Sequence, residues 1–222
     1  MRIRHRLKTW LARPEKYALS TFADVPLTEF GVESLYAERP DGGWRSYAGI
    51  PIERKWVDIF TVEVFLAHAQ PRLVIELGTG TGGFSAFLAT WCYQTGGKFM
   101  TFDTHYKGSP TKRANYRALG LIRRLAGSCQ SSEVFAARTV RQISNQVRRP
   151  GVAFIYCDNG NKAKELRTYA PLLKPGDFIA VHDYDSEVFL ADVEPVLDRC
   201  EFWHEDFCTR SRSSNRFFRI RS

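Results

Sequence analysis

Paired cysteine motifs are absent from this chain of 222 residues. Its five cysteines are an odd number and none of them forms a C-x-x-C pair, so neither a disulfide framework nor a cysteine-rich zinc site is expected. This cysteine usage is typical of a reducing compartment, and we expect a cytoplasmic protein. A chain of this length buries roughly 70% of the surface that its unfolded form exposes, so one substantial core needs no such crosslink.

Long apolar runs are missing as well. No stretch approaches the ~20 residues of a membrane span, because Asp58 and Glu63 interrupt the best candidate. The N-terminus is basic, but Arg13 ends its apolar stretch after a few residues, so we expect no cleaved signal peptide. Internal repeats and low-complexity tracts are also absent, and one globular domain is the default organisation.

The formal net charge of +8 is concentrated at the two ends, within residues 1–13 and 210–221. Such clusters can contact nucleic acid, an anionic membrane surface or a phosphorylated substrate. We favour a solvated surface, because the sequence has no aromatic-interleaved basic strand of the kind that binds RNA. Within residues 2–12 the apolar residues fall at helical spacing opposite the arginines, which predicts an amphipathic helix.

Apolar periodicity predicts alternating strands and helices after an irregular lead-in over residues 21–51. The predicted helices are 56–69, 84–93, 111–126, 140–147, 163–173 and 187–199. The predicted strands begin at Leu73 and continue with 98–103, 133–137, 152–158 and 177–182. This alternation predicts an α/β fold in which helices cover both faces of a parallel sheet. Two last strands, 201–207 and 216–220, are separated by a polar loop without room for a helix, so we expect them to pair antiparallel at one edge.

The most informative stretch is residues 73–85, LVIELGTGTGGFS, in which a β-branched run leads into clustered glycines. Gly78, Gly80 and Gly83 have the spacing G-x-G-x-x-G. Glycines at a strand-to-helix turn allow the backbone to approach a ligand closely. Glu76 lies at the carboxyl end of this strand, where it can accept hydrogen bonds from a cationic or hydroxyl-bearing ligand. The stretch therefore predicts a nucleotide-binding loop.

Acids or a histidine end four of the predicted strands, at Glu76, Asp103, Asp158 and the pair His182 and Asp183. In an open α/β sheet, ligands bind beyond the carboxyl ends of the strands, so these side chains should meet in one crevice. Asp103 follows the glycine loop at the distance at which an acid can hold a ribose hydroxyl pair.

The second group of strand-end residues leaves three interpretations open. Asp158, His182 and Asp183 could hold a divalent cation that favours a substrate alkoxide, either Mg²⁺ or, because of the imidazole, Mn²⁺, Fe²⁺ or Zn²⁺. His182 could instead be a metal-free general base oriented by a carboxylate, or the cluster could be purely structural. Lys162, at the entry to a helix, is either a desolvated base or a surface residue.

Four segments carry a resemblance in their order and spacing: ELGTGTGGFS (76–85), FDTH (102–105), CDNGNKAKEL (157–166) and APLLKPGDFIAVHDY (170–184). Together they resemble class I S-adenosylmethionine-dependent methyltransferases, in the branch that includes cephalosporin hydroxylase-type proteins and rhamnosyl and macrocin O-methyltransferases. The resemblance covers residues 51–222 and implies a Rossmann-like, doubly wound, mostly parallel seven-stranded sheet with an antiparallel C-terminal strand. Residues 1–50 would form a separate basic helix and cap.

The resemblance also implies roles for single residues. The acid matching Glu76 and the glycine loop would hold the methionine part of S-adenosylmethionine, and the acid matching Asp103 would hold its ribose. In metal-dependent relatives the positions matching Asp158, His182 and Asp183 bind Mg²⁺, and Lys162 resembles, one residue displaced, a catalytic lysine of catechol-type O-methyltransferases. The loop positions with this implied role are Gly78, Gly80, Gly82, Gly83 and Ser85.

We therefore expect an S-adenosylmethionine-dependent O-methyltransferase that acts on a hydroxyl of a sugar or another small molecule, with or without a divalent metal. An NAD-dependent oxidoreductase is the alternative that the glycine spacing and Asp103 equally permit; Glu76 and the terminal antiparallel pair weigh against it. The basic ends leave an RNA-directed methyltransferase or nucleic-acid-binding protein as a further alternative. The last alternative is a protein that binds an adenosyl ligand but has no catalytic activity.

Overall fold

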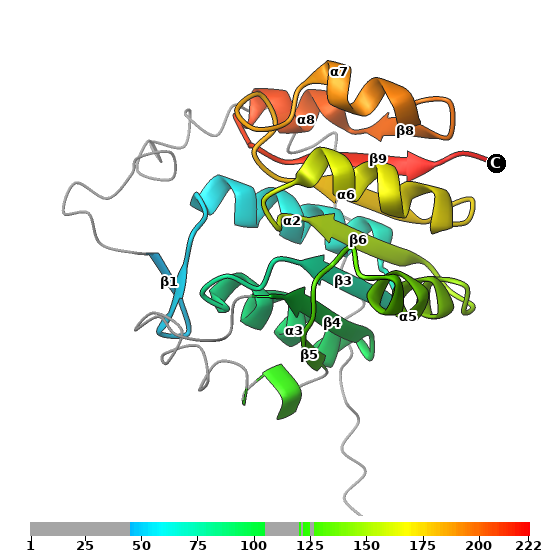
Figure 1. Cartoon of the computed structure of the whole chain (residues 1–222). Helices are drawn as coiled ribbons and strands as arrows, with labels where there is room; N and C mark the ends of the chain where they lie inside the picture. Colours follow the sequence, from blue (N-terminus) through cyan, green and yellow to red (C-terminus); the bar gives the residue numbers. More distant parts are fainter. Residues whose placement is uncertain (1–44, 105–119, 121, 125–126) are drawn as a thin grey trace, which may run out of the picture.

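The structure is a computed structural model, and it describes residues 45–104, 120, 122–124 and 127–222. Its centre is a seven-stranded sheet with the order β5-β4-β3-β6-β7-β9-β8 (Figure 1). The strands are β3 (Leu73–Leu77), β4 (Lys98–Asp103), β5 (Gly127–Ser131), β6 (Ala153–Cys157), β7 (Phe178–Val181), β8 (Cys200–Trp203) and β9 (Arg216–Ile220). Strand β9 runs antiparallel to both β7 and β8, whereas the pairs from β5 to β7 are parallel. The expected sheet, including the terminal antiparallel pair, is confirmed.

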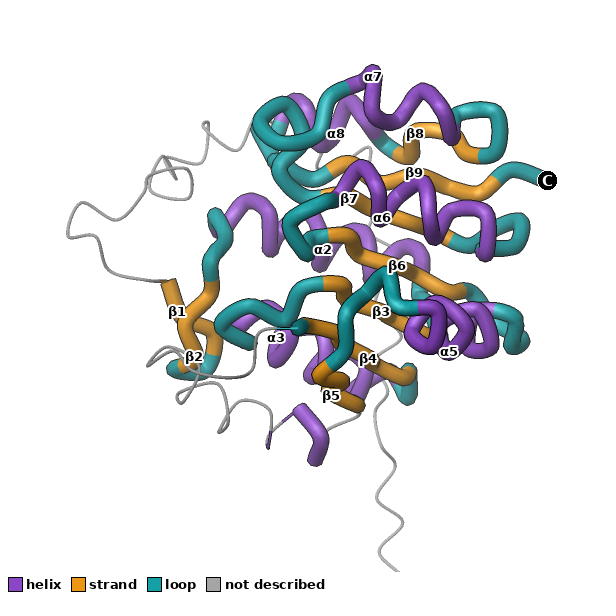
Figure 2. Tube along the Cα trace, viewed as in Figure 1, coloured by secondary structure: helices purple, strands orange, loops and turns teal. Residues whose placement is uncertain are grey.

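Helices cover both faces of the sheet, as Figure 2 shows. Helices α2 (Trp56–Ala69) and α3 (Gly83–Thr95) lie on one face, and α5 (Ala137–Val147) and α6 (Lys162–Tyr169) lie on the other. Each face has its own apolar core cluster. The central strands β3 and β6 are buried at every position, because helices cover a parallel strand on both sides. None of the helices in the described residues is long and apolar enough to cross a membrane.

A short hairpin precedes the sheet, where the sequence predicted an irregular lead-in. Its strands β1 (Arg45–Tyr47) and β2 (Ile50–Ile52) pair antiparallel, and Tyr47 contacts Phe87 of α3 edge to face. The hydroxyl of Thr81 donates a 2.6 Å hydrogen bond to the carbonyl of Pro51. The hairpin is thus tied to the glycine loop, and the residues that follow β2 enter the crevice beside this loop.

Three local predictions were wrong. The third strand is β5 at Gly127–Ser131, not residues 133–137, because a polar edge strand lacks the apolar alternation that marks a buried one. The helix expected over 187–199 is limited to α7 (Leu190–Val193) and the 3-10 turn η4 (Glu194–Val196), where Pro195 cannot continue the α-helical hydrogen bonding. The loop before β9 contains a helix, α8 (Glu205–Arg210), that sequence reasoning excluded.

Two further predictions cannot be compared with the structure. The basic helix over 2–12 lies outside the described residues, and so does most of the helix over 111–126. The remaining elements agree with the prediction to within a few residues, and α2, β4 and β9 agree at both ends.

Candidate functional site

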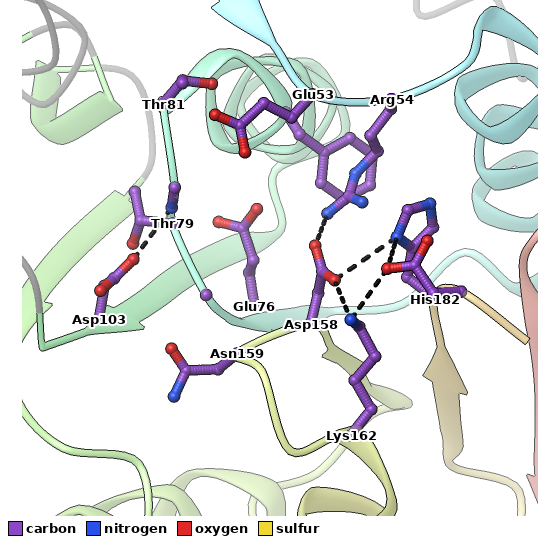
Figure 3. Close-up of a pocket in the computed structure, with 14 residues that line it drawn as sticks. Glu53, Arg54, Glu76, Thr79, Thr81, Asp103, Asp158, Asn159, Lys162 and His182 are labelled. Atoms are coloured by element: carbon purple, nitrogen blue, oxygen red, sulfur yellow. Dashed lines mark hydrogen bonds and ion pairs between the residues drawn. The ribbon is translucent and has the colours of Figure 1, made fainter. Parts of the chain in front are cut away.

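The strand ends that the sequence singled out converge on one cavity of about 440 Å³ at the carboxyl edge of the sheet (Figure 3). Its lining comes from the ends of β3, β4, β6 and β7, from the glycine loop and from the segment that follows β2. The lining residues are Glu53, Arg54, Glu76, Gly78, Thr79, Gly80, Thr81, Phe84, Asp103, Asp158, Asn159, Lys162, His182 and Asp183. Of the predicted loop positions, Gly82, Gly83 and Ser85 do not line the cavity.

Glu76 is fully buried at the floor of the cavity. Its Oε2 accepts a hydrogen bond from the hydroxyl of Ser85, which gives Ser85 a supporting place behind the acid. Its Oε1 has no hydrogen-bond partner among the described residues. Burial raises the pKa of Glu76 to about 7. A buried acceptor of this kind costs free energy unless a ligand donor completes its hydrogen bonding.

The glycines of the loop serve two different purposes. A Cβ on Gly78 would lie 2.1 Å from the carbonyl oxygen of Asp158, so this glycine permits the close approach of β3 and β6. A Cβ on Gly83 would lie 2.2 Å from the carbonyl oxygen of Pro51, in the hairpin. Gly80 differs, because a Cβ there meets only Oε2 of Glu53, at 3.9 Å. Gly78 and Gly80 both line the cavity, but of the three glycines only Gly80 leaves open space where a Cβ would stand.

Asp103 stands beside this open position. Its Oδ2 accepts a 3.0 Å hydrogen bond from the backbone N–H of Gly80. The side chain is 8% exposed at the end of β4. Behind it, the hydroxyls of Thr79 and Thr101 are 2.6 Å apart. The hydrogen bond between Gly80 and Asp103 thus fixes the glycine loop relative to the acid that is the candidate for binding ribose.

Asp158 is the centre of a charged cluster on the other side of the cavity (Figure 3). One of its oxygens is paired with Arg54, and the other lies 3.3 Å from Nζ of Lys162 and 3.5 Å from Nδ1 of His182. Burial raises the pKa of Asp158, but the charges of Arg54, His182 and Lys162 outweigh it and lower this pKa to about 2. Asp158 is therefore a carboxylate throughout the physiological range.

Asp183 joins the same cluster from the end of β7. Its Oδ2 lies 2.9 Å from Nζ of Lys162 and 3.0 Å from Nδ1 of His182. Its backbone is left-handed, with a φ of 57°, a strained conformation that is common at functional sites. Burial raises its pKa, but His182 and Lys162 outweigh it and lower the pKa well below its usual range.

Lys162 and His182 are the cationic partners of these acids. Burial lowers the pKa of Lys162, but Glu187, Asp158 and Asp183 outweigh it, and the pKa lies above its ordinary value. This arrangement favours a protonated ion-pair partner over the base considered from the sequence. Burial and Arg54 lower the pKa of His182, but Asp158, Asp183 and Asp58 raise it to about 9.

Sequence reasoning missed Arg54, which follows the hairpin in a run that looks like solvated charge. The residue is only 7% exposed. Its guanidinium carbon lies 4.2 Å from the ring centroid of Phe84 and 5.1 Å from that of Tyr156. Arg54 reaches Asp158 across 104 residues of sequence, so no local pattern could indicate the pair.

Asp58 was also missed, although an acid on the buried side of a helix is a detectable signal. Its carboxylate accepts 2.8 Å hydrogen bonds from the hydroxyl of Ser213 and the N–H of Ser214. Asn215 donates to the carbonyl of Asp58 and accepts from the hydroxyl of Tyr156. This network lies behind His182 and connects α2, β6 and the turn before β9.

The cluster offers a donor set for a divalent cation. One oxygen of Asp158, one of Asp183 and a ring nitrogen of His182 lie within 4.8 Å of one another. Two carboxylate oxygens with an imidazole suit Mg²⁺, Mn²⁺, Fe²⁺ or Zn²⁺. The residues therefore fit such an ion, although Lys162 contacts the same two carboxylates.

The chain is similar to proteins of one known family. The family model for Rhamnosyl O-methyltransferase/CmcI matches residues 44–199. Rhamnosyl O-methyltransferases of Mycobacterium bovis and Mycobacterium tuberculosis are 28% identical over 145 residues, which cover 62% of this chain and 56% of the relatives. The rhamnosyl O-methyltransferase of Mycobacterium leprae is 25% identical over 160 residues, covering 69% of this chain and 64% of the relative. The chain thus spans a little over half the length of the curated relatives that it matches.

Solved structures of CmcI share the fold. An apo-structure has a TM-score of 0.62 and 14% identity, covering 90% of this chain and 85% of the other. A CmcI structure described with Mg and SAM has a TM-score of 0.58 at 14% identity, covering 89% and 85%. Because the family model covers most of the residues, from the hairpin to the end of the turn before β8, the chain belongs to the Rhamnosyl O-methyltransferase/CmcI family.

Proposed function

We propose that the chain is an S-adenosylmethionine-dependent O-methyltransferase whose acceptor is a hydroxyl of a sugar or another small molecule. The observation that carries the proposal is the convergence of Glu76, Asp103 and Asp158 on one cavity in a member of this family. The relatives named rhamnosyl O-methyltransferase support a sugar as the acceptor.

The charge of the cavity supports a cationic methyl donor. Five lining residues are acids and three, Arg54, Lys162 and His182, are basic, so the excess of acids attracts the sulfonium and ammonium groups of S-adenosylmethionine. Glu76 has a buried oxygen that can accept a hydrogen bond from the ammonium group. Asp103 is placed to accept a hydrogen bond from a ribose hydroxyl, and Gly80 leaves room for the donor beside the backbone.

His182 and Asp183 mark the acceptor side. The acceptor oxygen must be held in line with the sulfonium methyl group and must lose its proton. Nδ1 of His182 lies between the carboxylates of Asp158 and Asp183. Because these carboxylates raise the pKa of His182 to about 9, the imidazole must first release its own proton before it can act as general base. Only 7% of His182 is exposed, which limits the access of water to its imidazole.

Asp158, His182 and Asp183 would hold a divalent metal. Bound there, the ion would supply Lewis-acid polarisation of the acceptor hydroxyl and lower its pKa. The metal-assisted and the metal-free route use the same residues, and excess EDTA distinguishes them. If EDTA abolishes methyl transfer and Mg²⁺ or Mn²⁺ restores it, the metal-assisted route holds. If transfer persists in EDTA, His182 removes the proton of the acceptor hydroxyl without the help of a metal.

The direct test of the function is transfer of a labelled methyl group from S-adenosylmethionine to sugar and small-molecule hydroxyls, combined with calorimetric binding of S-adenosylhomocysteine and NADH. We expect micromolar binding of S-adenosylhomocysteine, no binding of NADH and label in a methyl ether. Binding of NADH alone would establish the oxidoreductase alternative. Binding of S-adenosylhomocysteine without transfer to any acceptor would identify a silent adenosyl-binding protein.

A nucleic-acid acceptor has less support. Arg216, one of the C-terminal basic residues, is 6% exposed and donates to the carbonyls of Ser213 and Asn215. It also lies 4.7 Å from the ring centroid of Tyr184. This arginine therefore holds the chain around the site and is not available to contact phosphates. Label recovered in RNA instead of a small molecule would overturn this assignment.

A further inference from the structure

Lys162 has an unusual position for a lysine beside a candidate metal site. Its side chain is only 5% exposed, and its ammonium lies among three carboxylates. Nζ is 3.3 Å from Oδ1 of Asp158, 2.9 Å from Oδ2 of Asp183 and 2.5 Å from Oε2 of Glu187. Lys162 is the first residue of α6, so a short helix fixes the point from which the side chain reaches into the cluster.

Two of these three oxygens belong to Asp158 and Asp183, which form the candidate donor set together with His182. Oδ1 of Asp158 and Oδ2 of Asp183 also face Nδ1 of His182, at 3.5 Å and 3.0 Å. A divalent ion on this donor set would bind the same two carboxylates that Lys162 contacts. An ammonium and a divalent ion that contact the same carboxylates lie close enough to repel each other. Each cation therefore weakens the binding of the other to Asp158 and Asp183.

The third carboxylate has a different position. The side chain of Glu187 is 58% exposed, whereas those of Asp158 and Asp183 are 17% and 29% exposed. Glu187 does not belong to the donor set of the candidate metal site. It therefore offers the ammonium of Lys162 a partner at the solvent side of the cluster, away from the metal-binding oxygens.

We propose that Lys162 is a built-in cation that competes with a divalent metal for Asp158 and Asp183 and so sets the metal affinity of the site, and that Glu187 retains its ammonium when a metal binds. The inference rests on the proposed function only for the assignment of the cluster as a metal site. If Lys162 competes in this way, the carboxylates are neutralised even when no metal is bound. The site then binds a divalent ion more weakly than the same three donors would without Lys162.

The test uses Mn²⁺ alone as the probe and follows free Mn²⁺ by electron paramagnetic resonance at fixed ionic strength. Lys162→Met should bind Mn²⁺ at least tenfold more tightly than the unchanged protein, a difference of about 1.4 kcal/mol. Lys162→Gln, as a second neutral variant, should show the same change. Glu187→Gln should bind Mn²⁺ more weakly, because the ammonium then keeps only the metal-binding oxygens as partners.

Lys164→Met is the matched control. Lys164 is exposed on the same helix, and its ammonium lies 4.0 Å from the ring centroid of Phe135. Its removal changes the net charge equally, but we expect less than a twofold change in Mn²⁺ affinity. Equal gains in Lys164→Met and Lys162→Met would overturn the proposal in favour of a general charge effect.

Two other outcomes would also overturn the inference: Lys162 variants that bind Mn²⁺ no more tightly than the unchanged protein, and absence of Mn²⁺ binding in all of the proteins. Calorimetry with S-adenosylhomocysteine separates this failure from failure of the proposed function. Retained nucleoside binding in Lys162→Met shows an intact cavity, whereas loss of that binding in the unchanged protein contradicts the methyltransferase assignment and leaves the Mn²⁺ comparison valid.

Discussion

The carboxylate of Asp58 faces the imidazole of His182 from behind the cavity, with 3.6 Å between Oδ2 and Nε2. Asp58 is itself held by Ser213 and Ser214, and Nε2 of His182 has no hydrogen-bond partner among the described residues. This attraction turns the opposite nitrogen, Nδ1, toward Asp158 and Asp183. A carboxylate behind a histidine commonly fixes the ring and raises its basicity.

The first prediction concerns this carboxylate. Asp58→Asn should lower the rate of methyl transfer by about 10- to 100-fold, the usual cost of losing such a supporting partner. The affinity for S-adenosylhomocysteine should stay within about twofold, because Asp58 does not line the cavity. Steady-state kinetics and calorimetry measure the two effects. Ser213→Ala is the control, because it removes one hydrogen bond to Asp58 and keeps the negative charge; an equal loss in this control would mean that the network acts only on stability.

The second prediction is a pH dependence of stability caused by Glu76. Its pKa is about 7 in the folded protein against 4.5 for the ordinary group. Between these two values the folded state holds a proton that the unfolded state has released, so the free energy of unfolding falls as the pH rises from 4.5 to 7. Above pH 7 the full cost of the buried charge is present. Glu76→Gln removes this cost, up to roughly 3 kcal/mol at 1.36 kcal/mol per pKa unit.

Denaturant unfolding of the ligand-free protein at pH 5 and pH 8 tests this sign. Relative to the unchanged protein, Glu76→Gln should be clearly more stable at pH 8 and nearly equal at pH 5. The same variant should bind S-adenosylhomocysteine at least tenfold more weakly, since the carboxylate charge that would attract the ammonium is gone. A stability difference that is the same at both pH values would show that Glu76 is not buried as an acid with a raised pKa.

Much of the fold follows from the sequence because its signals are local. The runs LVIEL and AFIYC are fully buried strands, and their apolar, β-branched composition is visible without the structure. Strand ends meet at one edge of a parallel sheet, so the convergence of Glu76, Asp103 and Asp158 could be expected before any coordinates. The glycine loop could be predicted from the spacing of its own glycines.

The missed features depend on tertiary partners. Arg54 reads as surface charge until its pairing with Asp158 is known, and Asp58 acquires its place from Ser213, 155 residues away. The sequence could not tell which glycines pack against the chain and which face a ligand. Strand β5, GSCQS, has little apolar content because it is an edge strand, and its position is set by pairing with β4 and not by its own pattern.

The third prediction concerns the buried pair of Arg54 and Asp158. Arg54→Met should destabilise the protein by about 3–5 kcal/mol, because it leaves a buried carboxylate without one of its cations. Asp158→Asn in the same background should recover part of this loss. A double-mutant cycle from denaturant unfolding measures the coupling. Strict additivity of the two changes would mean that the pair contributes nothing specific, and that the stacking of Arg54 on Phe84 accounts for the cost.

The last prediction separates two glycines of one loop. Gly80 has a φ of 51°, and a Cβ there has only ordinary contact with Glu53 at 3.9 Å. Gly80→Ala should therefore cost about 1 kcal/mol of stability, the penalty of a left-handed alanine. It should reduce the affinity for S-adenosylhomocysteine at least tenfold, because the methyl group occupies the space in which the donor meets the backbone.

Gly78→Ala should show the reverse balance. Its Cβ would lie 2.1 Å from the carbonyl oxygen of Asp158, a backbone atom that cannot move without displacing the end of β6. We expect a stability loss of several kcal/mol, in the range of other severe backbone clashes. Denaturant unfolding and calorimetry on both variants decide the matter. If Gly80→Ala keeps full nucleoside affinity, the donor does not approach this part of the loop, and the cavity would bind its ligand through the acids alone.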